Sequence, residues 1–394
     1  MHEETLVDLN EEQQTIRDLA RTIAEEKVKP IRQKYDEEGT FPWDIVGELA
    51  KADLFRVFIP TAYEGLVERG LGVTNMCIVT EEISKVCAGI ALAFAGTALG
   101  AFPILLFGSD EQKRKFLPPI AAGKKLAAFG ITEPAAGSDA GAIRTTARRD
   151  GDDYVLNGTK IFITNGGEAD IYTIVALTQP EKGSRGASTF IVEKGTPGFT
   201  FGKRENKMGI HASATRELIF DGARVPAANL LGRDGMGFLV AMKTFDCSRP
   251  GVAAQALGIA EGALEETLKY VHHRQQFGKN VIAFQGIQWM LADMATEIEA
   301  ARALIYNTAA RIDRGETKDI GHLSAMAKVF ASDVAMKVTT DAVQIFGGYG
   351  YMSEYPVEKM MRDAKITQIY EGTNQIQRNV IGGYLVKEAA RLAE

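Results

Sequence analysis

Cysteine and histidine are scarce in this chain. Its 394 residues include three cysteines, Cys77, Cys87 and Cys247, with no CxxC pair and an odd count, which argues against a disulfide framework and favours a reducing compartment. The five histidines show neither HExxH nor HxxxH spacing, so the sequence contains no zinc ligand pattern. We therefore expect no metal site.

An excess of charge of one sign is also missing. The chain has 45 basic and 51 acidic residues, a formal net charge of -6, which provides no broad positive field for nucleic acid or an anionic bilayer. Its first residues, MHEETLVDLN, lack the basic or arginine-rich pattern of a targeting segment. We expect no membrane span either, taking the apolar runs to be shorter than the roughly 18 charge-free residues that one requires. These absences predict a cytoplasmic protein with no nucleic-acid partner.

Common nucleotide and hydrolase motifs are missing as well. The patterns GxGxxG after a strand, GxxxxGK followed by Ser or Thr, and GxSxG do not occur. Their absence removes the simplest grounds for a Rossmann dinucleotide site, a P-loop and a serine-hydrolase elbow. The chemistry must therefore depend on other residues.

What the chain does have is the length and composition of a globular protein with several domains. At roughly 100 to 200 residues per domain, 394 residues predict two to four units. Helical periodicity in the first and last thirds, with β-rich runs between turn residues in the middle third, indicates an α+β fold. We expect an N-terminal helical domain at 1–124, a middle antiparallel β-sandwich or barrel at 125–235 and a C-terminal four-helix bundle at 236–394.

Individual elements are predicted from caps, periodicity and turns. Asn10 with Gln13, and Ser109 with Gln112, have capping-box spacing, so helices are expected after residues 10 and 109. Asn374 shows the same spacing and predicts a helix from about residue 373. The other expected helices are 42–52, 73–94, 236–275, 285–314 and 319–346, and the expected strands are 154–165, 169–177, 188–194 and 216–225.

Five separated segments carry the most specific signal. They are GITEPAAGSDAGA (130–142), KIFITNGG (160–167), RQQFGK (274–279), QIFGGYGY (344–351) and IYEGTNQIQR (369–378), in this order. Together they make the whole chain resemble the acyl-CoA dehydrogenase family, of the FAD-dependent short- or medium-chain type. The resemblance implies an FAD cofactor, an acyl-CoA substrate, electron transfer flavoprotein as the electron acceptor, and a homotetramer built as a dimer of dimers.

The resemblance also assigns a cofactor site. Small residues in 130–138 would let the backbone approach a planar ring, and hydroxyls there would supply hydrogen bonds. Arg274 and Phe277, three apart on an expected helix end, would face one direction. The strip 344–348 matches residues that reach FAD in a neighbouring subunit, so the site would require a dimer. The implied FAD contacts are Phe129, Ile131, Thr132, Gly137, Ser138, Phe162, Ile163, Thr164, Arg274, Phe277, Phe284, Gln285, Gln344, Ile345, Gly347, Gly348, Thr373 and Gln375.

Several of these residues also have simpler structural interpretations. Taken singly, Phe162, which stands where relatives often have Trp, is more often a core residue than a flavin contact. Arg274 beside two glutamines is equally compatible with a solvated helix end. The residues from Thr373 are compatible with an ordinary helix cap that needs no ligand.

Glu371 is the implied catalytic base. In the family the hydrogens at Cα and Cβ of the thioester leave as a proton and a hydride, giving the trans-2-enoyl-CoA. The glutamate takes the proton and FAD N5 takes the hydride. A dry pocket would raise the pKa of Glu371 toward neutrality, and its backbone amide would donate to the thioester oxygen. Some relatives carry the base at the position of Ser248, which is not an acid here.

The implied substrate contacts are Ser138, Phe245, Asp246, Arg249, Tyr370 and Gly372. Arg249 is open to two interpretations, a ligand contact and a structural residue before Pro250. Ile90 stands where glutaryl-CoA enzymes place an Arg for the distal carboxylate, which disfavours a dicarboxylate substrate. Ala95 replaces a larger residue of some medium-chain relatives. We expect an apolar pocket for a short to medium, straight, branched or cyclic acyl chain.

Other functions on the same scaffold stay open. An acyl-CoA oxidase or an enoyl-CoA reductase would share these motifs, because oxygen reactivity and direction depend on the flavin surroundings. A more remote alternative is a DNA-associated flavoprotein that is not a dehydrogenase, as in a branch of the family with a basic C-terminal extension. The chain ends in KEAARLAE and has a net negative charge, which disfavours that alternative.

Overall fold

The computed structural model describes residues 7–316 and 318–393, so part of the N-terminal segment tested for a targeting signal lies outside the described residues. The helices are α1 (Glu11–Ile23), α2 (Arg32–Glu38), α3 (Trp43–Lys51), α4 (Val73–Phe107), α5 (Asp110–Ala121), α6 (Gly237–His273), α7 (Gln285–Asp313), α8 (Ile320–Phe346), α9 (Pro356–Thr367) and α10 (Asn374–Leu392). The strands are β1 (Ala127–Gly130), β2 (Thr146–Asp150), β3 (Asp153–Thr164), β4 (Ile171–Leu177), β5 (Ala187–Glu193), β6 (Phe199–Arg204), β7 (Thr215–Pro226), β8 (Leu230–Leu231), β9 (Gln275–Gln276) and β10 (Lys279–Asn280).

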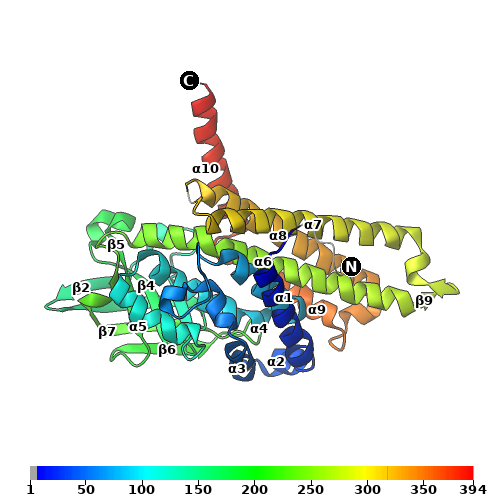
Figure 1. The fold of residues 1–394 in the computed structure, drawn as a ribbon, viewed down its shortest axis with the longest axis horizontal. Helices are drawn as coiled ribbons and strands as arrows, with labels where there is room; N and C mark the ends of the chain where they lie inside the picture. The colour runs from blue at the N-terminus through cyan, green and yellow to red at the C-terminus, as the bar shows by residue number, and fades with distance from the viewer. Residues whose placement is uncertain (1–6, 317, 394) are drawn as a thin grey trace.

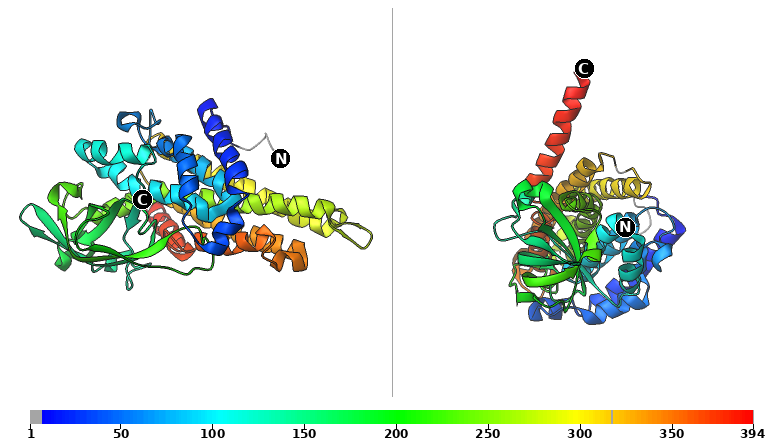
Figure 2. Two further views of the ribbon diagram at one scale, coloured as in Figure 1. Left: turned by 90° about the horizontal axis from the view of Figure 1, so that it is seen from below. Right: turned by 90° about the vertical axis from the view of Figure 1, so that its left-hand side faces the viewer.

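The order of these elements confirms the α+β fold with helices, then a sheet, then helices (Figure 1). The helical regions are not separate in space, because α4 from the first region packs along α6 from the last. The sheet and the β9–β10 hairpin lie at opposite ends of the molecule (Figures 1 and 2). The predicted domain boundaries at 124/125 and 235/236 stay predictions.

The middle region forms one eight-stranded sheet in the order β6-β7-β3-β2-β4-β5-β8, with β1 added beside β4. The pairs are antiparallel, as expected, except that β1 runs parallel to β4 and β2 meets β4 through one parallel pair. All four residues of β1 are buried, so this strand lacks the alternation by which a half-buried strand is recognised. For that reason β1 is missing from the predicted strands, although it leads directly into the 130–142 segment.

The C-terminal helices differ from the expected four-helix bundle. Helices α6, α7 and α8 pack on one another as predicted. Helix α10 instead projects away from the body (Figures 1 and 2), and only Asn374 and Gln377 at its start are buried. The unpredicted α9 packs against α6 and α8. The apolar side chains Leu385, Val386 and Leu392 of α10 are exposed rather than packed in the bundle.

Local signals in the sequence were partly right. The capping boxes of Asn10 with Gln13 and of Ser109 with Gln112 are confirmed. The capping box expected at Asn374 is wrong, because the cap of α10 is Thr373, whose hydroxyl accepts a hydrogen bond from the Ile376 amide. The Asn374 side chain is buried and makes other contacts, which matter for the site below.

Residues Arg274 and Phe277 do not share a helix end, so that prediction is wrong. Helix α6 ends at His273, and the chain turns into the β9–β10 hairpin. The two hairpin loop residues, Phe277 and Gly278, have φ values of 53° and 76°. Positive φ at both positions is typical of a tight hairpin turn that a following Gly favours.

The expectation about apolar runs is also wrong. Helix α4 contains an 18-residue window with mean hydropathy 2.1, long and apolar enough by composition to cross a membrane. In the structure 78% of that window is buried inside the protein, and a core helix passes the same test of length and composition. Its packing on α6 and β1 explains why this window of the helix is apolar on all sides.

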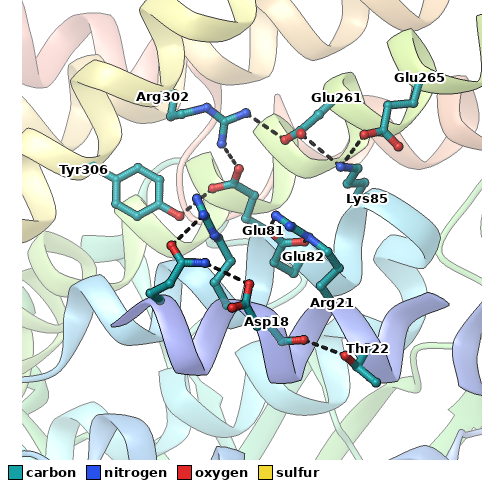
Figure 3. Close-up of polar contacts among 12 residues, drawn as sticks. Asp18, Arg21, Thr22, Glu81, Glu82, Lys85, Glu261, Glu265, Arg302 and Tyr306 are labelled. Carbon is teal, nitrogen blue, oxygen red and sulfur yellow. Dashed lines mark hydrogen bonds and ion pairs between the residues drawn. The ribbon is translucent and has the colours of Figure 1, made fainter. Parts of the chain in front are cut away.

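The charged residues within α4 are paired across helices (Figure 3). Glu81 of α4 accepts hydrogen bonds from Arg302 and, at 2.6 Å, from the Tyr306 hydroxyl of α7. Arg302 also bonds Glu261 of α6 at 2.7 Å, and Glu261 bonds Lys85 of α4 at 3.0 Å. This network joins the three longest helices and compensates each buried charge with an opposite one.

Candidate active site

Two cavities meet where the sheet, α4, α6 and the turn before α10 come together. The first cavity, of about 410 Å³, extends between α4 and α6. The second cavity, of about 590 Å³, lies between the sheet and the segment from α9 to α10. The residues that line both are Thr132, Gly137, Ser138, Phe162, Thr164, Tyr370, Glu371 and Gly372. The sequence motifs at 130–142, 160–167 and 369–378 therefore converge on one place.

Glu371 occupies the boundary between the cavities. It lies in the short turn between α9 and α10 with φ of 51°, and Gly372 follows with φ of 92°. Its carboxylate accepts a 2.5 Å hydrogen bond from the Ser248 hydroxyl of α6. Removal from bulk water raises the pKa of Glu371, and Ser248, Arg249 and Lys328 each offset part of that rise. A carboxylate with a raised pKa beside an apolar cavity has the properties of a general base.

The far end of the first cavity is apolar. Its walls there are Met76, Leu92, Ala95, Gly96 and Leu99 of α4, and Gly251 and Val252 of α6. The Tyr370 hydroxyl donates to the Gln255 side chain, whose amide nitrogen donates to the Ala88 carbonyl at 3.2 Å. A Cβ at Gly251 would lie 2.8 Å from the Met76 methyl group, so glycine preserves space in this end of the cavity.

Phe162 is not a core residue, so the structural interpretation of this residue alone is wrong. The pairing of β3 with β7 shifts register between Lys160 and Ile163, and Phe162 has φ of 58° within that irregularity. A bulge of this kind turns a side chain out of the sheet. The ring is 64% exposed and lines both cavities together with Thr164.

A buried ion pair fixes the loop that carries Gly137 and Ser138. Lys160 of β3 contacts Glu133 at 2.7 Å and donates to the Ile131 carbonyl at 3.1 Å. The Glu133 carboxylate also accepts from the backbone amides of 144 and 145, at 2.6 and 3.0 Å. Burial lowers the pKa of Lys160 to about 8, and Glu133 offsets part of that shift.

Removing the lysine of this pair should loosen the loop. We expect Lys160→Met to lower the free energy of unfolding by about 3 kcal/mol, because it leaves the Glu133 carboxylate buried without its cation. The variant should also lose bound cofactor faster on dilution. Denaturant unfolding and absorbance after gel filtration measure both effects. Lys115→Met, which removes an exposed pair with Glu193, is the control and should change stability by less than about 1 kcal/mol. Equal behaviour of the two variants would contradict this role.

The predicted cofactor residues divide into two groups. The first surrounds the two cavities and consists of Phe129, Ile131, Thr132, Gly137, Ser138, Phe162, Ile163, Thr164 and Thr373. The second lies around a third cavity of about 490 Å³, lined by Arg274, Ile345, Gly347 and Gly348. The third cavity has no lining residue in common with the other two. A single chain therefore does not bring the two groups together.

The remaining predicted cofactor residues line none of these cavities. Phe277 is 93% exposed on the hairpin, with its ring centroid 6.1 Å from that of Phe284. Gln285, Gln344 and Gln375 are exposed.

The predicted substrate residues mostly line the first cavity. Ser138, Phe245, Arg249, Tyr370 and Gly372 do so, whereas Asp246 faces α8, where its carbonyl accepts from the Ser324 hydroxyl at 2.7 Å. Both interpretations of Arg249, as a ligand contact and as a structural residue, agree with its position. It lines the cavity, and its Nε donates to the Glu371 carbonyl at 3.4 Å.

Comparison with known proteins identifies the family of this chain. Models of the N-terminal, middle and C-terminal domains of acyl-CoA dehydrogenase match residues 10–124, 128–223 and 235–385. The chain belongs to the acyl-CoA dehydrogenase family. It is therefore an oxidoreductase that acts on CH–CH groups. FAD, which structures of other family members contain, is its cofactor.

Three individual relatives are informative. Butyryl-CoA dehydrogenase of Megasphaera elsdenii is 49% identical, with a TM-score of 0.94, over 96% of this chain and 99% of that one. A chain in the structure of the electron transferring flavoprotein of Acidaminococcus fermentans, described in relation to electron bifurcation, is 51% identical with a TM-score of 0.93, over 96% and 98%. The NADH-dependent acryloyl-CoA reductase of Anaerotignum propionicum is 49% identical over 96% of this chain and 95% of its own length.

Several residues of the site were not found from the sequence. Gln255, Lys328 and Gln377 contact the Glu371 turn from α6, α8 and α10. Lys328 left a signal, because SAMAKVFA places a lysine in an apolar helical pattern, where an unpaired charge is costly. Gln255 and Gln377 left no comparable signal, since glutamine is common on helix surfaces.

Proposed function

We propose that this enzyme converts a short- or medium-chain acyl-CoA thioester to the trans-2-enoyl-CoA, with Glu371 abstracting the α-proton. The observation that carries the proposal is the position of Glu371, where an apolar cavity meets a second cavity with an exposed aromatic wall. When bound, FAD supplies the acceptor for the β-hydride at its N5 atom. A cytoplasmic location is part of the proposal.

The turn provides both groups that the proton transfer needs. A thioester α-proton is too weakly acidic for a carboxylate in water, so the carbonyl must be polarised and water excluded. The Glu371 backbone amide has no hydrogen-bond acceptor among the described residues, so it is available to the thioester oxygen. The Glu371 carboxylate belongs to the same residue, which fixes the base and the amide relative to each other.

The residues around the second cavity fit a flavin ring. Its walls combine the exposed ring of Phe162 with the hydroxyls of Thr132, Ser138 and Thr164. The start of α10 at Thr373 presents backbone amides and partial positive charge to the same cavity. These donors suit the carbonyl and nitrogen acceptors of an isoalloxazine, and about 590 Å³ is within the range of cofactor sites.

The third cavity supports a proposed homotetramer, built as a dimer of dimers. Arg274 there is suited to a diphosphate, but the second cavity of the same chain is formed by other elements. A second copy would bring its third cavity to the cofactor held by the first. Apolar side chains of Trp289 on α7 and of Leu385 and Val386 on α10 are more than half exposed, which favours their burial in an assembly.

The electron acceptor we propose is an electron transfer flavoprotein. The similarity to the chain in the Acidaminococcus fermentans structure supports it. A second candidate function is enoyl-CoA reduction on the same site, which the similarity to an acryloyl-CoA reductase favours. The two differ in direction rather than in the residues that act.

An anaerobic bleaching screen tests the proposal. The purified holoenzyme is mixed with straight and branched acyl-CoA thioesters from propionyl to dodecanoyl, and the flavin absorbance is followed. We expect rapid bleaching by one group of saturated thioesters, and reoxidation by ferrocenium faster than by oxygen. No bleaching by any saturated thioester, with oxidation of the reduced enzyme by an enoyl-CoA alone, would favour the reductase instead.

A further inference from the structure

Lys328 of α8 is a fully buried lysine directly behind the catalytic turn. Its ammonium donates to the Gly372 carbonyl and to the Asn374 side-chain oxygen, each at 2.9 Å. Among the described residues no carboxylate forms an ion pair with it. The other buried lysines, Lys85, Lys160 and Lys359, each pair with a glutamate or aspartate. Lys328 thus stands apart, because burying a cation without a paired anion is unfavourable.

The turn that Lys328 contacts depends on outside support. Glu371 is a non-glycine residue in the left-handed region, a conformation that persists only where surrounding contacts determine it. The Gly372 carbonyl accepts from Lys328 and, at 2.8 Å, from the Gln377 side chain. The Glu371 carbonyl accepts from Gln377 at 3.0 Å and from Arg249. Side-chain donors therefore hold both carbonyls of the turn in place, while the Ser248 hydroxyl holds the Glu371 carboxylate.

The charges near Lys328 leave Glu371 as its main electrostatic partner. Arg249 of α6 opposes the lysine charge, and Asp333 of α8 favours it. Asp333 is already bound by Arg378 of α10 at 2.8 Å. Burial lowers the pKa of Lys328 to about 7, and the Glu371 charge raises it. In return the lysine charge lowers the pKa of Glu371, so each group stabilises the charged form of the other.

We propose that Lys328 is a positioning residue for the base: it fixes the left-handed turn through the Gly372 carbonyl and places a buried positive charge behind the Glu371 carboxylate. The inference rests on the proposed role of Glu371. It assigns a task to a side chain that touches neither cavity.

Two substitutions separate the contact from the charge. Lys328→Met removes both and retains the volume of the side chain. Lys328→Gln retains a hydrogen-bond donor but has no charge. Lys337→Met, on the same helix, removes an exposed pair with Glu297 and is the matched control. For each holoenzyme, the rate of anaerobic flavin reduction by the best acyl-CoA is measured from pH 5 to 10, with the FAD content and the thioester dissociation constant.

We expect Lys328→Met to bind FAD and thioester within about threefold of the wild type, while flavin reduction slows by about 100-fold. Its pH midpoint on the acid side should move to higher pH, because below the Lys328 pKa of about 7 the carboxylate loses a nearby positive charge. Lys328→Gln should recover part of the rate but keep the raised midpoint. A structural role alone would not produce this split between rate and midpoint.

Other outcomes overturn the inference. A Lys328→Met enzyme with the rate and midpoint of Lys337→Met does so directly. If Lys328→Met does not bind FAD, Lys328→Gln is the test. A wild-type midpoint in Lys328→Gln, or loss of its FAD, would reject the positioning role of Lys328. A wild-type enzyme that no acyl-CoA reduces, or a Glu371→Gln variant with full rate, would instead reject the proposed function and with it this inference.

Discussion

Replacing Glu371 by glutamine should give a folded, yellow protein whose flavin acyl-CoA thioesters no longer bleach. Glutamine has nearly the same shape, and its amide oxygen can still accept from Ser248, so the cavities and bound FAD should persist. A neutral amide cannot take the α-proton. We expect the rate of flavin reduction to fall by about 10⁴-fold, the upper end of the range for general bases. Anaerobic stopped-flow absorbance measures it.

The pH dependence sharpens this test. Because burial raises the pKa of Glu371 and only the ionised form is a base, the wild-type rate should fall as pH is lowered through that raised pKa. This limb of the profile should vanish in Glu371→Gln. Glu354→Gln, at an exposed glutamate on the turn before α9, is the control and should keep both rate and profile. A Glu371→Gln enzyme with more than about a tenth of the wild-type rate would remove Glu371 as the base.

Replacing Arg302 by methionine should produce the largest loss of stability. The substitution leaves the buried Glu81 and the partly buried Glu261 without the cation that joins them, although Lys85 still pairs with Glu261 (Figure 3). We expect the free energy of unfolding to fall by about 5 kcal/mol at pH 8, since breaking a buried ion pair from one side leaves uncompensated charge. Denaturant unfolding of the holoenzyme at fixed protein concentration measures the change.

The sign of the pH effect follows from the two carboxyls. In the wild type the pKa of Glu81 is raised to about 7, chiefly by burial, and that of Glu261 is lowered to about 2, where Arg302 and Lys85 outweigh burial. Loss of Arg302 should raise both values. The variant should therefore lose most stability relative to the wild type at high pH and regain part of it toward pH 5, as its carboxyls take up protons. Arg311→Met, at an exposed pair with Glu316 on the same helix, should stay within about 1 kcal/mol of the wild type. A similar small change for Arg302→Met at pH 8 would contradict the role of the network.

Elements with a strong local signal could be predicted. The capping boxes at Asn10 and Ser109 and the turn-bounded strands of the middle region depend on neighbouring residues, and the structure confirms them. Strand β1, helix α9 and the outward turn of Phe162 depend on contacts between distant segments. Hydrophobic periodicity and secondary-structure propensity contain no information about such contacts.

The site residues that could be predicted from the sequence are likewise those with a local signal. Glu371, Ser138, Phe162 and Thr373 lie in short contiguous segments, and the structure brings those segments together. The side chains that hold the Glu371 turn come from three different helices. Arg249, Lys328 and Gln377 hold its two backbone carbonyls through isolated side-chain hydrogen bonds, and no spacing in the sequence records such bonds. Asp246 shows the opposite error, because its neighbours Phe245 and Arg249 line the cavity while its own position on the helix faces α8.

In the proposed reaction one carboxylate and one flavin act on opposite faces of the same two carbons. A crystal structure of the FAD enzyme with a slowly reacting thioester tests it most directly. We expect a Glu371 oxygen within about 3.5 Å of the thioester Cα, and the flavin on the other side of the Cα–Cβ bond. A complex with the acyl chain in the first cavity and the Glu371 carboxylate turned away from Cα would contradict the account.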